Sequence, residues 1–181
     1  MDAMGCQTSI VSEIVEKGGD YVIGLKGNQG NLHESVERYF ADVSPEECEK
    51  SDDTSVLYHV EKGHGRIEER VYVIDEKVRW LPGFSKWAGL RSIGMVMSKR
   101  TIGDKQTSER RYYISSLPCD VESFAQAVRN HWQIENGLHH VLDVSFGEDR
   151  SRIRSSYAPE NMAVIRRMTA YEESESDRHD R

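Results

Sequence analysis

The chain has 181 residues, a formal net charge of −7, a charged fraction of 30% and a hydrophobic fraction of 37%. This size suits one domain with an insertion, or two small domains, and is large enough to bury a hydrophobic core. No apolar run approaches the roughly 18 residues that span a bilayer, and the N-terminus lacks the layout of a secretory signal. We therefore expect a cytoplasmic protein that makes no membrane contact.

The cysteines and the charge distribution narrow the possible partners. The three cysteines are scattered and form no CxxC pair, which argues against a disulfide framework and against a zinc site. Glu34–Lys62 holds nine acids and three bases, whereas Arg91–Cys119 holds six bases and two acids. Because salt screens charges beyond about 10 Å, a basic face of this acidic chain can still bind phosphates.

The first 30 residues predict one αβ unit. Apolar residues at a spacing of four, such as Ile10 and Ile14, predict an amphipathic helix that ends at Gly18-Gly19. The apolar run Asp20–Leu25 then predicts a short buried strand, which we expect to be parallel to its neighbours. The polar segment Lys26–Gly30 follows it as a turn.

The middle of the chain predicts a helix at Leu32–Phe40, an acidic loop at Ser44–Thr54 and then a β-rich region. Four strand-like runs follow, at Val56–Glu61, Arg66–Asp75, Arg91–Lys99 and Glu109–Ser115. We expect a turn at His64-Gly65 and a hairpin loop at Thr101–Thr107 between them.

Apolar residues at helical spacing return in the last third of the chain. They predict one helix at Val121–Val144 and a second at Ala158–Ala170. The remaining sequence, YEESESDRHDR, has no apolar periodicity, so we expect this tail to be disordered.

Two carboxylates are candidates for chemistry. At about 100° per residue, Glu135 shares one helix face with His131 and His139. This face has two possible roles: it packs on a sheet with Glu135 at the rim, or it forms a site for an anion or a metal. The carboxylate spacing does not suit zinc, and hard cations prefer oxygen ligands, so Mg²⁺ is the better candidate. Asp2 lies at a strand-to-helix junction, where α/β folds place their sites; the alternative is a terminal or N-cap residue.

Two further groups of polar residues can contact phosphates. The first follows the predicted strand and forms either a simple turn or a contact with phosphate or base edges: Lys26, Asn28 and Gln29. The second alternates along an extended segment and forms either a phosphate-binding row or solvated charges: Arg150, Arg152 and Arg154.

Six segments in one order carry a resemblance to a known family. They are DAMGCQ (Asp2–Gln7), GGDYVIGLKGNQ (Gly18–Gln29), HGRIEER (His64–Arg70), RYYISSL (Arg111–Leu117), RNHWQIENGLHHVLDVSFGEDRSRIR (Arg129–Arg154) and APENMAVIRR (Ala158–Arg167). In this order they resemble the DDE transposases of bacterial insertion sequences, in particular the H-repeat-associated (ISAs-type) branch. A set of spaced segments is highly specific, whereas a single one would not be.

The resemblance implies a partial RNase H-like fold of the α/β class, a mixed sheet with flanking helices and a β-rich insertion before the last catalytic helix. We therefore expect part of the catalytic core at residues 1–30, the insertion at residues 31–118, the C-terminal helices of the core at residues 119–170 and the tail at residues 171–181.

The resemblance also implies metal-dependent DNA cleavage and strand transfer at the ends of an insertion sequence, with Mg²⁺ or Mn²⁺ held by three carboxylates. By position, Asp2 matches the second catalytic aspartate and Glu135 matches the glutamate, so both are expected to be catalytic residues and metal ligands. The residues expected to contact DNA are Lys26, Asn28, Gln29, Arg129, His131, Trp132, His139, Arg150, Arg152 and Arg154.

One part of the family pattern is missing. The first catalytic aspartate of the family lies in an Asp-Gly-Lys context, and this sequence contains no such segment. We therefore expect an N-terminally truncated remnant of a transposase. Two alternatives stay open: an inactive fragment that only binds DNA or full-length transposase, and an RNase H-like nuclease unrelated to transposition. The oligomeric state, including a homo-oligomer, is open too.

Overall fold

The computed structural model describes residues 6–41, 44–48, 51–63, 65–133, 152, 154 and 157–165. The chain divides into two compact units, Met1–Val128 and Arg129–Arg181. Among the described helices, none combines the length and the apolar character that crossing a membrane requires.

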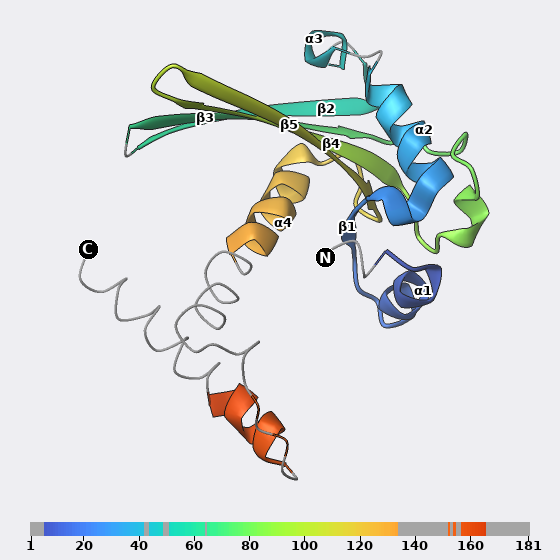
Figure 1. Ribbon diagram of the computed structural model, residues 1–181. Helices are drawn as coiled ribbons and strands as arrows, with labels where there is room; N and C mark the ends of the chain where they lie inside the picture. Colours follow the sequence, from blue (N-terminus) through green and yellow to red (C-terminus); the bar gives the residue numbers. More distant parts are fainter. Residues whose placement is uncertain are drawn as a thin grey trace. The chain divides into compact units, whose positions relative to one another are not determined.

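A five-stranded antiparallel sheet is the centre of the first unit (Figure 1). Its strands lie in the order β1-β5-β4-β3-β2. Their bounds are Val22–Gly24 for β1, Thr54–Gly63 for β2, Arg66–Asp75 for β3, Ser92–Ile102 for β4 and Lys105–Ser115 for β5. The hairpins β2–β3 and β4–β5 supply four of these strands, and β3 and β4 join them. The expected β-rich region is therefore confirmed.

The orientation of the first strand differs from the prediction. β1 pairs antiparallel with β5, from Val22↔Ser115 to Gly24↔Tyr113, so the expected parallel strand is wrong and the described sheet is not mixed. A strand that is covered on both faces is apolar throughout, whichever direction its neighbour runs. The run Asp20–Leu25 therefore predicted a buried strand correctly but carried no information about its direction.

Helix α2 (Gly30–Ala41) covers one face of the sheet. Its buried residues follow a helical spacing and include Val36 and Phe40. The ring of Phe40 stacks on that of Tyr112 in β5, with centroids 6.3 Å apart. Burial of such aromatic side chains is a large part of the stability of a core of this size.

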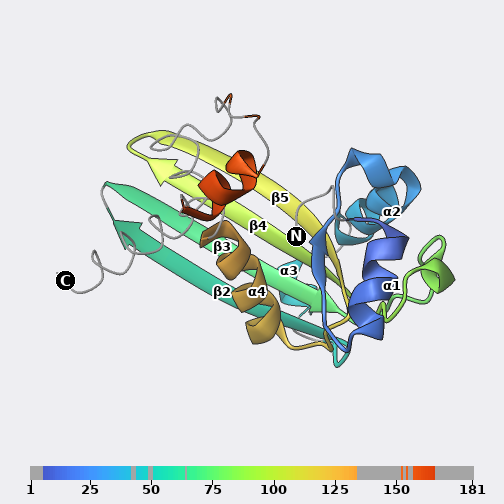
Figure 2. The ribbon, with the colours of Figure 1, turned by 90° about the horizontal axis from the view of Figure 1, so that it is seen from below.

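Helix α4 (Val121–Gln133) covers the opposite face, as Figure 2 shows from below. The ring of Phe124 makes edge contacts with Tyr113 and Tyr72, at centroid distances of 5.5 and 6.4 Å. Gly94 lies directly under this ring, so α4 sits close to the backbone of β4. Before the helix, Asp120 accepts a hydrogen bond from the backbone N–H of Ser123 (3.1 Å), as an N-cap residue does.

The shorter elements confirm some boundaries and correct others. Helix α1 (Thr8–Glu16) and α2 were expected, and residues 158–165 are helical within the predicted second C-terminal helix. The predicted acidic loop instead contains a short helix, α3 (Pro45–Cys48). Two 3₁₀ turns complete the described elements: η2 (Gly27–Gln29) and η3 (Phe84–Lys86).

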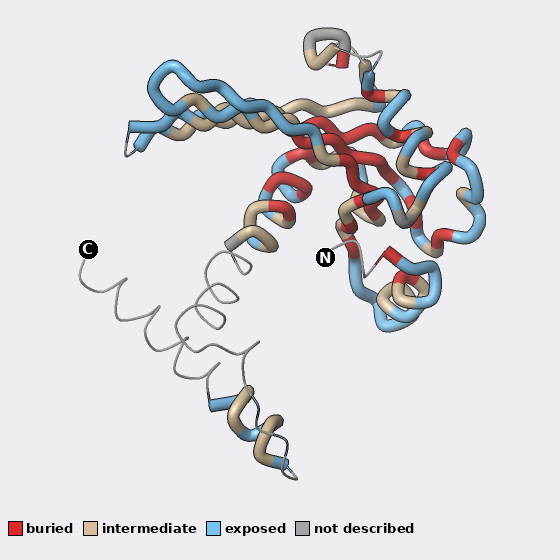
Figure 3. Tube along the Cα trace, viewed as in Figure 1, coloured by how far each residue is buried: buried red, intermediate tan, exposed pale blue. Residues whose placement is uncertain are grey.

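The outer half of the sheet, near the hairpin turns, is largely exposed (Figure 3). In β5 the first six residues are exposed and the last four are buried, and β4, which runs in the opposite direction, shows this gradient in reverse. The four strands β2 to β5 therefore continue beyond the core. At the turn between β2 and β3, Gly65 (φ 73°) supplies the left-handed backbone conformation that a tight turn requires.

Candidate functional site

The loop that follows β1 is tied to the N-terminal segment. Nε2 of Gln29 donates a hydrogen bond to the backbone oxygen of Cys6, a fully buried residue. Cys6 is four positions after Asp2 in the sequence. Lys26 is exposed in the same loop, and the side chain of Asn28 lies outside the described residues. The expected DNA-binding loop thus also holds the segment that leads away from Asp2.

The last turn of α4 presents three of the predicted DNA-contacting residues. Arg129, His131 and Trp132 are all half-buried, and each has a contact with another residue. The expected catalytic Glu135 is two positions after Gln133, the last described residue of α4, and lies outside the described residues.

The remaining predicted site residues are described only in part. Arg152 and Arg154 are exposed. Asp2, His139 and Arg150 lie outside the described residues, so the structure does not bring the two expected carboxylates together or separate them.

In the part of the chain that is described, no three His, Cys, Asp or Glu side chains are grouped closely enough to hold a metal ion. The most buried of the described carboxylates, Asp75, is 2% exposed and its oxygens are already used by protein donors. A divalent ion therefore does not fit the described residues, and the candidate ligands remain Asp2 and Glu135.

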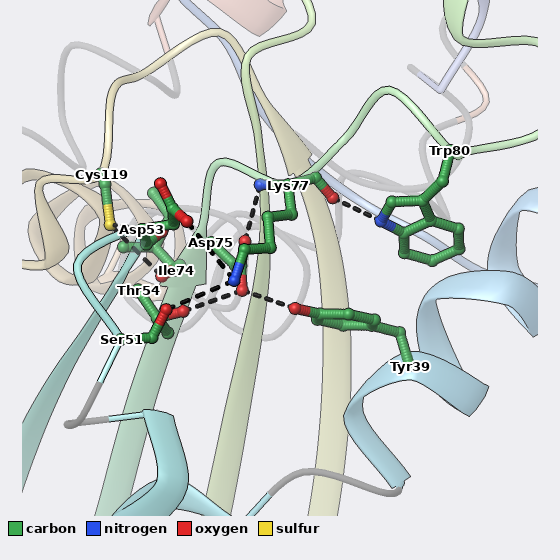
Figure 4. Close-up of polar contacts among 9 residues, drawn as sticks. All are labelled: Tyr39, Ser51, Asp53, Thr54, Ile74, Asp75, Lys77, Trp80 and Cys119. Atoms are coloured by element: carbon green, nitrogen blue, oxygen red, sulfur yellow. Dashed lines mark hydrogen bonds and ion pairs between the residues drawn. The ribbon is translucent and has the colours of Figure 1, made fainter.

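Asp75 is the centre of a polar cluster at the inner end of β3 (Figure 4). Its Oδ2 accepts hydrogen bonds from the hydroxyl groups of Tyr39 (2.7 Å) and Thr54 (2.8 Å). Its Oδ1 accepts one from the backbone N–H of Lys77 (2.6 Å). One carboxylate thereby connects α2, β2 and the loop after β3. In the sequence, Asp75 alternates with Val71 and Val73 and so shares their face, but Tyr72 and Ile74 on the other face are buried too, so alternation alone does not indicate this role.

Aromatic rings cover this cluster on one side. The ring of Trp80 lies beside that of Tyr39, with centroids 5.2 Å apart, and its Nε1 donates to the backbone oxygen of Lys77 (2.5 Å). Burial, followed by the hydrogen bond to Asp75, raises the pKa of Tyr39 above its ordinary value. The hydroxyl group of Tyr39 therefore stays protonated and remains a donor to Asp75 near neutral pH.

Cys119 lies at the edge of the same cluster. Its Sγ is 3.3 Å from the backbone oxygen of Asp53 and 3.5 Å from that of Ile74. Burial, followed by the nearby carboxylates of Glu76, Asp75 and Asp53, raises the pKa of this thiol to about 11. A protonated thiol is a poor nucleophile and a poor metal ligand, so Cys119 acts as a weak hydrogen-bond donor here.

An antiparallel sheet with helices on both faces gives the first unit a fold that combines α-helices and β-strands. The sequence model of the family described as "Transposase DDE domain" matches residues 1–171. The chain is 40% identical over 172 residues to "Putative transposase YncI" of Escherichia coli O157:H7, a match that covers 93% of this chain and 43% of that protein. The chain belongs to the DDE transposase family.

Further relatives give the branch of that family. The chain is 39% identical over 170 residues to "H repeat-associated putative transposase YhhI" of E. coli strain K12, which covers 91% of this chain and 44% of that protein. The chain therefore spans less than half the length of these curated relatives. No solved structure matches the chain.

Proposed function

We propose that this chain acts in DNA transposition, with Asp2 and Glu135 as two carboxylates of a metal-dependent site for strand cleavage and transfer at insertion-sequence ends. The family match over residues 1–171 carries this proposal, because it includes both carboxylates in one domain. Asp2 and Glu135 would hold Mg²⁺ or Mn²⁺, which would supply activation of the attacking water or hydroxyl group and stabilisation of the leaving oxygen.

The segments next to the two proposed carboxylates each have one contact within the first unit. The hydrogen bond from Gln29 to Cys6 fixes the segment after Asp2 against the loop that follows β1. The packing of Phe124 on the sheet fixes the start of the helix that leads toward Glu135. Both segments are thereby anchored in the first unit, and we infer that they are parts of an RNase H-like core that the β-hairpins interrupt.

The exposed bases suit a DNA backbone. Lys26, Arg152 and Arg154 are exposed, and cations in such positions bind phosphates with a strong dependence on salt. Arg129, His131 and Trp132 are half-buried residues of α4 that come shortly before Glu135 in the sequence. We propose these six residues, together with Asn28, Gln29, His139 and Arg150, as the DNA contacts.

A second function follows from one sequence observation. No Asp-Gly-Lys segment occurs among the 181 residues, so the first carboxylate of the family pattern is not among them. Two carboxylates hold a pair of metal ions less well than three, so a chain that binds DNA or a full-length transposase without cleaving is the alternative.

A nicking assay separates the two functions. The substrate is duplex DNA with the terminal repeats of the insertion sequence, incubated with the chain in Mg²⁺ or Mn²⁺. We expect metal-dependent cleavage that falls on the order of a thousandfold or more in Glu135→Gln, because a group in the catalytic site acts on the transition state. Glu122→Gln is the control, since Glu122 is an exposed acid in the first turn of α4.

Cleavage that persists unchanged in Glu135→Gln contradicts the proposed site. DNA binding without any cleavage by the wild-type chain favours the inactive alternative.

A further inference from the structure

Arginine residues gather on the outer half of the sheet, on the same face that α4 covers nearer the core. Successive strand residues point to opposite faces of a sheet, and directly paired residues share a face. Arg66, Glu68 and Arg70 of β3 therefore lie on the face of Tyr72, whose ring contacts Phe124 of α4. This part of β3 is exposed or half-buried.

One carboxylate holds three guanidinium groups at this place. Oε1 of Glu68 is 3.4 Å from Nε of Arg66 and 3.6 Å from Nε of Arg100, which pairs with Glu68 in the register of β3 and β4. Oε2 of Glu68 accepts a hydrogen bond from Arg70. The Glu68 side chain is 14% exposed, whereas those of Arg66 and Arg100 are 46% and 48% exposed. We refer to these four residues as the arginine cluster.

The arginine cluster is positively charged although the whole chain is negative. Three arginines and one glutamate give +3 − 1 = +2. Glu61 pairs with Arg70 at 3.3 Å and reduces this to +1, so the group keeps a positive charge.

The cluster has more donors than its acids can use. Each guanidinium group carries five N–H donors, so three carry fifteen, whereas one carboxylate accepts about four hydrogen bonds. Ion pairs at this exposure contribute little to folding stability, so stability does not account for three arginines on one acid. Glu68 instead holds the guanidinium groups in place, and the side chains of Arg66 and Arg100 stay accessible to solvent.

We propose that the arginine cluster binds the phosphate backbone of duplex DNA. Guanidinium groups match phosphate oxygens in paired hydrogen bonds, and an exposed sheet face with a positive charge complements the phosphates of a duplex. This surface reads no base sequence; it positions the duplex on the side of the sheet that carries α4. The inference rests on the proposed function in one respect, namely that DNA is the substrate.

A matched pair of double variants tests this surface. Arg66→Gln with Arg100→Gln removes two charges from the cluster. Lys62→Gln with Lys99→Gln removes two charges at the same level of the hairpins but on the opposite face, because Lys62 pairs with Ile67 and Lys99 pairs with Glu69. Binding of the full chain to a duplex is measured by fluorescence anisotropy in EDTA at several salt concentrations, with the melting temperature of each variant as a folding check.

We expect the cluster variant to lose affinity on the order of 50-fold at about 0.1 M salt and to reduce the slope of log K against log salt by about 1.8, because each phosphate contact contributes about 0.9. The opposite-face variant should retain the wild-type slope. Arg66→Lys with Arg100→Lys keeps both charges and should retain most of the slope as well.

Equal losses of DNA affinity in the two double variants, or no loss in the cluster variant, overturn the proposal that the arginine cluster binds DNA. A wild-type chain that binds a polyglutamate peptide at this cluster but not duplex DNA also overturns it. Such results leave nicking that depends on Glu135 untouched. Conversely, the cluster variant can lose DNA affinity while no nicking depends on Glu135. That result overturns the proposed catalytic role of Glu135 and supports the DNA-binding role of the arginine cluster.

Discussion

Replacing Asp75 with alanine is expected to lower the free energy of unfolding by about 3–5 kcal/mol. The substitution leaves three donors without their acceptor: the hydroxyl groups of Tyr39 and Thr54 and the backbone N–H of Lys77. Asp75 is 2% exposed, so water does not reach these donors without a local rearrangement. Because domains are stable by only about 5–15 kcal/mol, this loss threatens the fold itself.

Chemical denaturation followed by circular dichroism measures this effect. Glu69→Ala is the control, because Glu69 lies on the same face of β3 but forms only an exposed pair with Lys99, 3.6 Å away. We expect the control to change stability by less than about 0.5 kcal/mol. Asp75→Asn keeps an acceptor for Lys77 and should be intermediate. An alanine variant within about 1 kcal/mol of the wild type would show that the cluster does not hold α2 to the sheet.

Replacing Gly94 with valine is expected to destabilise the chain by about 2–3 kcal/mol and to displace α4. A Cβ atom at Gly94 would lie 2.5 Å from Cζ and 2.7 Å from Cε2 of Phe124. The ring cannot retreat easily, since Tyr72 and Tyr113 both contact it. The displacement matters for function because α4 leads toward Glu135.

A double-mutant cycle isolates this contact. Gly94→Ala alone should be clearly destabilising, and Phe124→Leu in the same chain should recover part of that loss, since the two changes share one site. Gly63→Ala serves as the control: Gly63 lies on the same face of the sheet, and a Cβ atom added there would meet no other atom within 4 Å. If Gly94→Ala and Gly63→Ala have equal effects on the unfolding midpoint, α4 does not pack closely on the backbone at Gly94.

The periodic elements of the fold could be predicted from the sequence. The alternation in Arg66–Asp75 predicts β3 with its observed bounds, and the spacing of Ile10 and Ile14 predicts α1. The expected hairpin loop at Thr101–Thr107 is wrong in its bounds, because β4 extends to Ile102 and β5 begins at Lys105. Backbone pairing across the hairpin, rather than side-chain preference, extends these strands.

The polar clusters could be predicted only in part. The alternating positions of Arg66, Glu68 and Arg70 are visible in the sequence, but Arg100 joins them only through the register of β3 and β4. In the same way, alternation puts Asp75 on the face of Val71 and Val73, whereas its partners Tyr39 and Thr54 come from other elements of the chain. Periodicity shows which face a residue occupies and cannot show which distant residues share that face.

Mn²⁺ binding to the full chain tests most directly the proposal that Asp2 and Glu135 share one metal site. Electron paramagnetic resonance counts free and bound Mn²⁺ without requiring cleavage. We predict binding by the wild-type chain and a loss of affinity of about tenfold or more in both Asp2→Asn and Glu135→Gln, since each removes a charged oxygen ligand. The exposed-acid variant Glu122→Gln should bind as the wild type does. Wild-type affinity in either Asp2→Asn or Glu135→Gln would contradict the shared site.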